Sequence, residues 1–376
     1  MTREYVVPGR VELVGKHVDY AGGRSLTCAI EPSIRTQVTP LAEPVLRVRD
    51  TARREGVAVA LSANAKSHGP RWSTYAVAVA RRLSRDFPVV KTGVEIQLHS
   101  DLPVSAGLSS STALVVAMAT ALVDANDLEQ DAGWRTVVPD LVARAAYFAA
   151  IETGAPFGPF AGDPGVGVRG GAQDHAAIVC AEDGMMGQFQ YLPLRLERRV
   201  PWPNEYAIVI AASGVQATKT GNARDAYNRL SDAMVAHARG VRPDRPDPQL
   251  SARLEQFHQE TEVIVPGVAA AMQNRDFATL GGLVHRSQSL AERVLGNQVP
   301  ETVFLARSAR EAGAIAATAF GAGFGGAVWA MVPSHDAATF AGLWRAGYER
   351  AFPQRRAHAK WIVTRPSGPA REVASA

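Results

Sequence analysis

The sequence is poor in cysteine and in lysine, and each shortage excludes a class of protein. Two cysteines, Cys28 and Cys180, stand far apart among 376 residues and lack the spacing of metal ligands. We therefore expect free thiols in a reducing, cytoplasmic setting rather than a disulfide-bonded secreted protein. Five of the 40 basic residues are lysines, and the arginines are scattered without neighbouring aromatic residues. That pattern, with a net charge of +4, gives no indication of nucleic-acid binding.

The sequence also lacks an unbroken apolar run that could span a membrane. The long uncharged stretch at 312–332 is interrupted by Gly321, Gly323, Gly325 and Gly326. We expect a helix, a glycine loop and a strand there, not a membrane span. The first residues contain no apolar segment typical of a signal peptide, which again favours the cytoplasm and no membrane partner.

Hydrophobic residues make up 47% of the chain, which suffices for one large or two ordinary domains. Alternating or short apolar runs predict strands at 5–14, 25–39, 94–98, 207–212 and 327–332. Helical patterns occur at 72–83, 114–122, 137–153, 251–275, 277–293, 300–313 and 337–352. Gly- and Pro-rich residues 154–171 predict a long loop, and residues 240–248 a surface linker. Mixed strands and helices favour the α+β class, and we expect domains at 1–195 and 196–376.

The most informative stretch is Asp101-Leu-Pro-Val-Ser-Ala-Gly-Leu-Ser-Ser-Ser-Thr-Ala113. A predicted strand precedes it and a predicted helix follows it. The turn between them leaves backbone N–H groups unpaired at the helix start, where the helix dipole favours an anion. Ser109, Ser110 and Ser111 add hydroxyls that can cap the helix, bind phosphate oxygens or ligate Mg²⁺.

Two further motifs stand near the ends of the chain. The first is Pro8-Gly-Arg-Val-Glu-Leu-Val-Gly-Lys-His-Val-Asp-Tyr-Ala-Gly-Gly23, and the second is Phe320-Gly-Ala-Gly-Phe-Gly-Gly326. With the serine loop between them, this order resembles the GHMP kinase superfamily, and within it galactokinases. Shorter matches lie between the motifs: Trp72-Ser-Thr-Tyr75, Gly170-Gly-Ala-Gln-Asp-His175, Ala226-Tyr-Asn-Arg229, Ser287-Gln-Ser-Leu290 and Val299-Pro-Glu301. The resemblance therefore runs in order over most of the chain.

The resemblance implies a two-domain α+β fold, with a ribosomal-protein-S5-like first domain, a ferredoxin-like second domain and the active site in the cleft between them. It implies ATP- and Mg²⁺-dependent phosphorylation of a monosaccharide at the anomeric C1 hydroxyl, by a monomer or homodimer. The residues expected at the nucleotide are Pro103, Ser105, Ala106, Gly107, Leu108, Ser109, Ser110, Ser111 and Trp72. For Trp72, a place in the core is the alternative interpretation.

The resemblance also assigns roles around the sugar. Asp174 is expected to accept or orient the hydroxyl proton, and Arg10 to lie beside it and stabilise the moving phosphoryl group. Without the resemblance, a turn aspartate and a surface arginine would be the simpler interpretations. Residues expected to contact the sugar are Lys16, His17, Asp19, Tyr20, Gly171 and Tyr227. Ser111 is the expected Mg²⁺ ligand, with Ser110 as its alternate.

Two departures from the family pattern bear on function. Lys16 replaces a glutamate that meets the outer hydroxyl of the hexose in galactokinases. We therefore weigh galactose against a C6-modified relative such as galacturonate. The second metal ligand is displaced, because the family's position falls on Ala149 and Glu152 lies about one helical turn later. Either Glu152 serves through a shifted register or water completes the coordination.

Two other functions stay open from the sequence. A protein of this kind could bind sugar and ATP as a sensor with weak or no catalysis. It could also be a different GHMP small-molecule kinase, such as a heptose or mevalonate-type kinase, although the residues at 10–20 point away from the isoprenoid branch.

Overall fold

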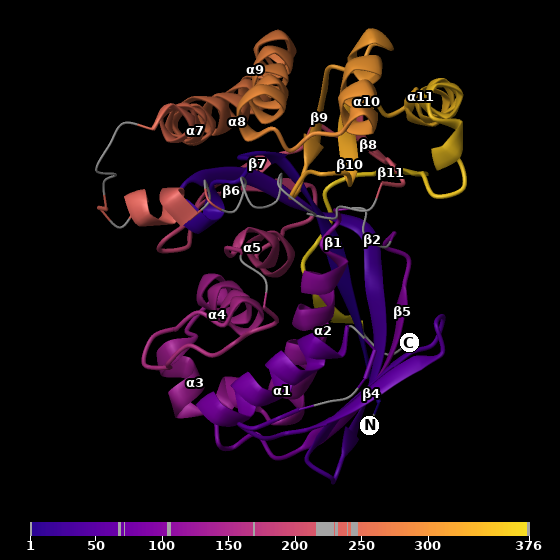
Figure 1. The fold of residues 1–376 in the computed structure, drawn as a ribbon. Coiled ribbons are helices and arrows are strands. Elements are labelled where there is room, and N and C mark those ends of the chain that lie inside the picture. Colours follow the sequence, from indigo (N-terminus) through magenta and orange to yellow (C-terminus); the bar gives the residue numbers. More distant parts are fainter. Residues whose placement is uncertain are drawn as a thin grey trace.

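Two β-sheets organise the chain in the computed structural model, which describes residues 2–66, 69–70, 72–103, 107–167, 170–215, 229, 232–238, 240–241 and 247–373 (Figure 1). The main path of the first sheet runs β12–β1–β2–β5–β3–β4, and β6 pairs with both β2 and β7. Its strands are β1 (Arg3–Val14), β2 (Arg24–Leu41), β3 (Val45–Asp50), β4 (Glu55–Ala60), β5 (Gly93–Ser100), β6 (Met185–Gln190), β7 (Arg195–Pro201) and β12 (Arg371–Val373). The pairing of β3 with β5 is parallel, and the other pairings in this sheet are antiparallel.

Helices cover one face of the first sheet (Figure 1). They are α1 (Ser73–Asp86), α2 (Ser110–Ala125), α4 (Leu141–Thr153) and α5 (Gln173–Val179), with the short α3 (Ala132–Val137) and the 3-10 turn η2 (Leu128–Gln130) beside them. The sequence dictates which face is covered, because β5 buries Val94, Ile96 and Leu98 and turns Gln97 to solvent. Helix α2 is apolar on nearly every side and is accordingly buried.

The second sheet is antiparallel and has the order β11–β8–β10–β9. Its strands are β8 (Tyr206–Ala212), β9 (Ala316–Phe320), β10 (Ala327–Pro333) and β11 (Lys360–Thr364). Both faces of the sheet are covered, which explains why β8 is a continuous apolar run. Ile208 and Ile210 belong to the core shared with the first sheet, while Val209 belongs to a separate core on the other face. That other face packs against α10 (Pro300–Glu311) and α11 (Ala337–Ala351).

Helices that the sequence predicted as two long segments contact both sheets. The first contains α7 (Pro248–His258), the π-helical turn η3 (Gln259–Ile264) and α8 (Val265–Asn274). The second contains α9 (Phe277–Leu290) and the π-helical turn η4 (Ala291–Leu295). Asp247 caps α7 by accepting from the N–H groups of Gln249 and Leu250, so the predicted linker ends where this helix begins.

The predicted strands and helices are confirmed, except that the helix predicted at 137–153 begins at Leu141 and that the stretch after residue 311 was interpreted wrongly. Residues after 311 do not continue as helix, because α10 ends at Glu311 and β9 occupies Ala316–Phe320. The run is rich in alanine and favours a helix locally, but burial on both faces of a sheet decides the outcome. The short hairpins β3–β4 and β6–β7 were also not predicted.

The sheets do not change at the predicted boundary near residue 195. Strand β7 (Arg195–Pro201) still pairs with β6 in the first sheet, and the second sheet begins with β8 at Tyr206. Near its end the chain returns to the first sheet, where β12 pairs with β1 and Val373 lies opposite Glu4 (Figure 1). Within the described residues, no helix is both long and apolar enough to cross a membrane.

Candidate active site

Arg10 and Asp174 meet although 164 positions separate them. Arg10 lies in β1 and is 4% exposed, and Asp174 lies in the first turn of α5. The guanidinium Nε donates to Asp174 Oδ1 at 2.7 Å, and its NH1 donates to the carbonyl of Gly107. The sequence prediction that these two groups face each other is therefore confirmed as geometry.

The environment of Asp174 keeps its carboxylate ionised. Burial pushes the pKa upward, but the charge and hydrogen bond of Arg10 and the hydroxyl of Ser109 outweigh it, so the pKa of Asp174 lies below its usual range. The side chain of Asp174 is 30% exposed, which leaves it open to a ligand. The group can orient a hydroxyl and accept a proton late in a reaction, but it is a weak base.

The predicted phosphate loop lies beside this pair. Gly107 has φ +77° and Ser109 has φ +58°, a left-handed backbone that a residue with a side chain rarely adopts. Ser109 does not cap α2; its hydroxyl donates to Asp174 instead. Ser110 and Ser111 open the helix and are half-buried. The loop thus leads from the Arg10–Asp174 pair directly to the N-terminus of α2.

The structure describes some of the other residues predicted to contact the nucleotide, but not all of them. Pro103 is half-buried, and Leu108 is buried with its carbonyl accepting from the N–H of Arg10 at 3.3 Å. Trp72 precedes α1, packs against the core and donates from Nε1 to Glu55 at 3.0 Å. Ser105, Ala106 and the predicted sugar residue Tyr227 lie outside the described residues.

Asp19 is the second carboxylate of the site. It opens the 3-10 turn η1 (Asp19–Ala21), and the nearby backbone N–H groups of Tyr20 and Gln173 favour its ionised form. Burial, aided by the Asp174 charge, raises the pKa of Asp19 to about 6. A Cβ at Gly171 would lie 2.4 Å from Asp19 Oδ2, so glycine is needed for the two segments to approach.

The C-terminal glycine loop closes over the same region. His17 has φ +56°, and its Nε2 lies 3.2 Å from the carbonyl of Ala322 and 3.0 Å from Asn297 Nδ2. Gly321 approaches Gly107, because a Cβ on Gly321 would stand 3.6 Å from the Gly107 carbonyl oxygen. The three sequence motifs therefore converge on one place.

The Lys16 side chain makes a different contact from the one the sequence interpretation gave it. Its side chain is 1% exposed, and Nζ donates to Ser287 Oγ at 2.9 Å. Burial lowers the pKa of Lys16, opposed by the charges of Glu260 and Glu12. The ammonium is used inside the protein, so the expected contact with a substituent at the far carbon of the sugar is corrected.

Glu152, the residue predicted to serve as a metal ligand in a shifted register, lies beside the first turn of α2. The carboxylate is buried at the end of α4, where Oε2 accepts from Thr112 Oγ1 at 3.1 Å and lies 3.1 Å from His175 Nε2. Thr112 follows Ser111 in the first turn of α2, so a hydroxyl and a carboxylate, both hard oxygen donors, stand near each other. Among the described residues, no group of three or more His, Cys, Asp or Glu side chains is arranged to hold a metal.

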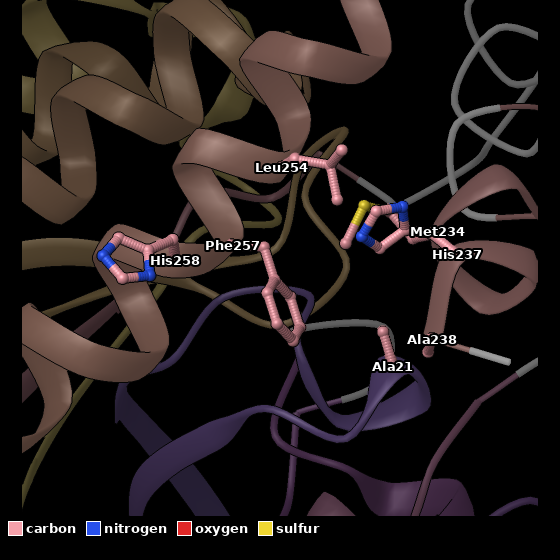
Figure 2. Close-up of a pocket in the computed structure, with 7 residues that line it drawn as sticks. All are labelled: Ala21, Met234, His237, Ala238, Leu254, Phe257 and His258. Atoms are coloured by element: carbon pink, nitrogen blue, oxygen red, sulfur yellow. The ribbon is translucent and has the colours of Figure 1, made fainter. Parts of the chain in front are cut away.

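An apolar cavity of about 270 Å³ borders η1 (Figure 2). Figure 2 shows Met234 and His237 of the helical residues 232–238 opposite Leu254 and Phe257 of α7, with Ala21 and Ala238 below them. Its lining in the described part of the chain includes neither Arg10 nor Asp174, so we place no chemistry there.

Several supporting residues were missed in the sequence. Arg253 of α7 is 1% exposed, and its NH2 donates to the carbonyl of His17 and to the hydroxyl of Tyr20 at 2.9 Å. Nothing separates this arginine from the others of an arginine-rich chain, so no sequence signal could have found it. Asn297, in the bend before α10, was missed for the same reason.

Three family models match the sequence. The model described as the GHMP kinases N terminal domain matches residues 74–158, and the GHMP kinases C terminal model matches residues 268–347. The galactokinase galactose-binding signature matches residues 3–40, which include Arg10 and Asp19.

Curated relatives and solved structures agree with these models. A galactokinase of Roseiflexus sp. is 28% identical over 357 residues, covering 89% of this chain and 84% of that protein. A galactokinase of Mycobacterium tuberculosis is 28% identical over 370 residues, covering 93% of this chain and 95% of that protein. The Lactococcus lactis galactokinase complexed with galactose has a TM-score of 0.83 at 19% identity, covering 99% of this chain and 95% of that one. A Methanococcus jannaschii mevalonate kinase has a TM-score of 0.62 at 14% identity, covering 97% and 98%. The likeness in structure shows the two-domain fold.

Proposed function

Because the chain belongs to the GHMP kinase superfamily and is galactokinase-like, we propose that it transfers the γ-phosphoryl group of ATP to the anomeric C1 hydroxyl of a hexose. The observation that carries the proposal is the Arg10–Asp174 pair beside the loop before α2. A cation, a carboxylate and a helix N-terminus at one place are the parts that phosphoryl transfer requires.

Asp174 orients the sugar hydroxyl and accepts its proton as the new P–O bond forms. The lowered pKa of Asp174 means that the carboxylate is ready as an acceptor at neutral pH. Arg10 keeps it ionised and presents its remaining charge to the moving phosphoryl group. Such a pair acts mainly by position and charge, as expected where the transition state has little covalent demand on the protein.

The N-terminus of α2 holds the triphosphate. Backbone N–H groups of the loop and the positive end of the helix dipole favour the phosphate charges. Ser111 and Glu152 would hold Mg²⁺, with Ser110 as alternate to Ser111. When bound, Mg²⁺ supplies charge neutralisation of the phosphate oxygens.

Asp19 accepts hydrogen bonds from neighbouring sugar hydroxyls, with His17, Tyr20, Gly171 and Tyr227 around the ring. The burial of Lys16 favours galactose over galacturonate, because the ammonium that could recognise a C6 carboxylate is bound to Ser287. A sensor role is the competing function, and it predicts binding of sugar and ATP without turnover.

A kinase assay separates these functions. ADP release is measured by an enzyme-coupled assay with galactose, galacturonate, arabinose and fucose. We expect turnover with galactose as the preferred sugar and a loss of about 10²–10⁴-fold in Asp174→Asn. Asp183→Asn, at an exposed aspartate, is the matched control and should keep the wild-type rate. Calorimetric binding of sugar and ATP without ADP release would support the sensor and contradict the kinase.

A further inference from the structure

Three ionisable groups are buried together behind the sugar site, and none of them has a role in the reaction described above. They are Glu12 of β1, Lys16 in the turn after β1, and Glu260 of η3, which are 2%, 1% and 0% exposed. Burial of one ammonium with two carboxylates is costly unless the groups compensate one another. The cluster therefore needs a physical account.

We propose that Lys16 is a positioning residue that holds Asp174 in place through Glu12 and Gln173. The proposal rests on the function proposed above and deepens it. It assigns the lysine that replaces the family's glutamate to the support of the site, not to contact with the sugar.

Lys16 is anchored by a hydroxyl that is itself bound to a carboxylate. Its Nζ donates to Ser287 Oγ at 2.9 Å, and that hydroxyl donates to Glu260 Oε1 at 2.6 Å. The other oxygen of Glu260 accepts from the N–H of Gly15 at 3.0 Å. The lysine side chain and the backbone just before it are thus tied to the same carboxylate, which fixes the ammonium between η3 and α9.

Glu12 contacts the segment that carries Asp174. Glu12 Oε2 accepts from Gln173 Nε2 at 2.7 Å, and Gln173 directly precedes Asp174 at the start of α5. The backbone N–H of Gln173 also lies near Asp19 and favours its ionised form. One residue therefore links the carboxylate of Glu12 to both carboxylates of the candidate site.

The charge of Glu12 is balanced by neighbouring groups of both signs. Among the described residues, no group donates a hydrogen bond to Oε1 of Glu12. The charge of Lys16, the Gln173 hydrogen bond and the charge of Arg10 favour the ionised form of Glu12. The charge of Glu260 in η3 disfavours that form, and the uncharged phenol of Tyr191 lies nearby. Burial raises the pKa of Glu12 to about 7, despite the opposing charge of Lys16. Without Lys16 the pKa would rise further, and Gln173 would lose its charge-assisted acceptor at neutral pH.

The test uses Lys16→Met and Glu12→Gln in the full chain, with Lys91→Met at an exposed lysine as the matched control. We expect kcat/KM for the sugar to fall about tenfold or more in Lys16→Met, while KM for ATP stays within about twofold. The acidic limb of the pH profile should move to higher pH in Lys16→Met, and the part of that limb near pH 7 should disappear in Glu12→Gln. The proposal would be overturned if Lys16→Met kept the wild-type rate and pH profile. It would also be overturned if Lys16→Met changed the sugar preference while the acidic limb of its pH profile stayed at the wild-type pH.

Thermal unfolding supplies a readout that needs no turnover. A carboxyl whose folded pKa is raised favours folding below its unfolded pKa, and this contribution is lost as pH rises through the folded pKa. The Tm deficit of Lys16→Met relative to wild type should therefore be larger at pH 8 than at pH 5.5, by about 2 °C or more. Adding Glu12→Gln to Lys16→Met should remove that difference.

These measurements separate a failure of the proposed kinase function from a failure of the positioning role of Lys16. Wild-type protein that phosphorylates none of the sugars contradicts the proposed function, whatever the unfolding data show. An equal Tm deficit at both pH values shows that Lys16 does not compensate Glu12, and it overturns the positioning role even in an active enzyme.

Discussion

At the scale of single residues, two carboxylates in one site have opposite pKa shifts. Arg10 and Ser109 hold the pKa of Asp174 below its usual range, whereas burial and the Asp174 charge raise the pKa of Asp19 to about 6. Neighbouring acids that are pushed apart in this way commonly divide the work of a site. In the proposed function, Asp174 would face the reacting hydroxyl and Asp19 would hold the sugar ring.

The raised pKa of Asp19 predicts a pH effect on sugar use. Below about pH 6 Asp19 gains a proton and becomes a weaker acceptor, so kcat/KM for the sugar should fall as pH drops through 6. The profile between pH 5 and 8 in Asp19→Asn should lack this fall, at a rate reduced by about tenfold or more. A fall near pH 6 that persists in Asp19→Asn would assign it to another group.

At the scale of elements, the site depends on close approach between loops. The segment before α5 passes against η1, and the glycine loop after β9 passes against the loop before α2. At the first approach a Cβ on Gly171 would clash with Asp19, and at the second Gly107 and Gly321 both have φ +77°, which favours glycine. The helices and strands supply fixed ends, and the loops between them carry the chemistry.

Gly170 and Gly171 form a matched pair for testing this approach. A Cβ at Gly171 would lie 2.4 Å from Asp19 Oδ2, whereas a Cβ at Gly170 would meet nothing within 4 Å in the described structure. We expect Gly171→Ala to raise KM for the sugar about tenfold or more, and Gly170→Ala to change it less than about twofold. Equal effects of the two changes in steady-state kinetics would show that backbone freedom, and not the approach to Asp19, is what matters.

At the scale of the whole molecule, the two sheets share a core. Residues of β1, β2 and β5 cluster with Ile210 of β8 and Trp329 of β10. The Trp329 indole, 1% exposed, donates from Nε1 to the carbonyl of Leu13 at 3.2 Å. Because β12 also returns to β1, neither half has its full set of partners alone.

A shared core predicts that the chain unfolds in one transition. In urea, wild type should show a single transition by circular dichroism and by fluorescence, and Trp329→Ala should lose about 3–5 kcal/mol while remaining cooperative. Trp361→Ala, at a half-buried tryptophan on β11, should cost less. Two transitions, of which Trp329→Ala shifts one alone, would mean that the halves fold independently.

The sequence predicted most of what the motifs carry and little of what supports them. Arg10, Asp19 and Asp174 could be placed because they stand in ordered strings with glycines and serines whose local geometry is distinctive. Strand β9 could not be predicted, because its alanines favour a helix locally whereas its burial in the second sheet makes it a strand. Lys16 was placed in the right segment and given the wrong contact, since the direction of a side chain depends on Glu260 and Ser287, more than 240 positions away.

The roles of the site residues remain predictions, and one measurement tests the central claim most directly. The phosphorylated product of galactose and ATP is examined by ³¹P NMR, with wild type and Asp174→Asn in parallel. The account predicts a phosphate coupled to the anomeric proton, formed by wild type and almost absent with Asp174→Asn. A phosphate coupled to the two C6 protons, or equal product from the variant, would contradict it.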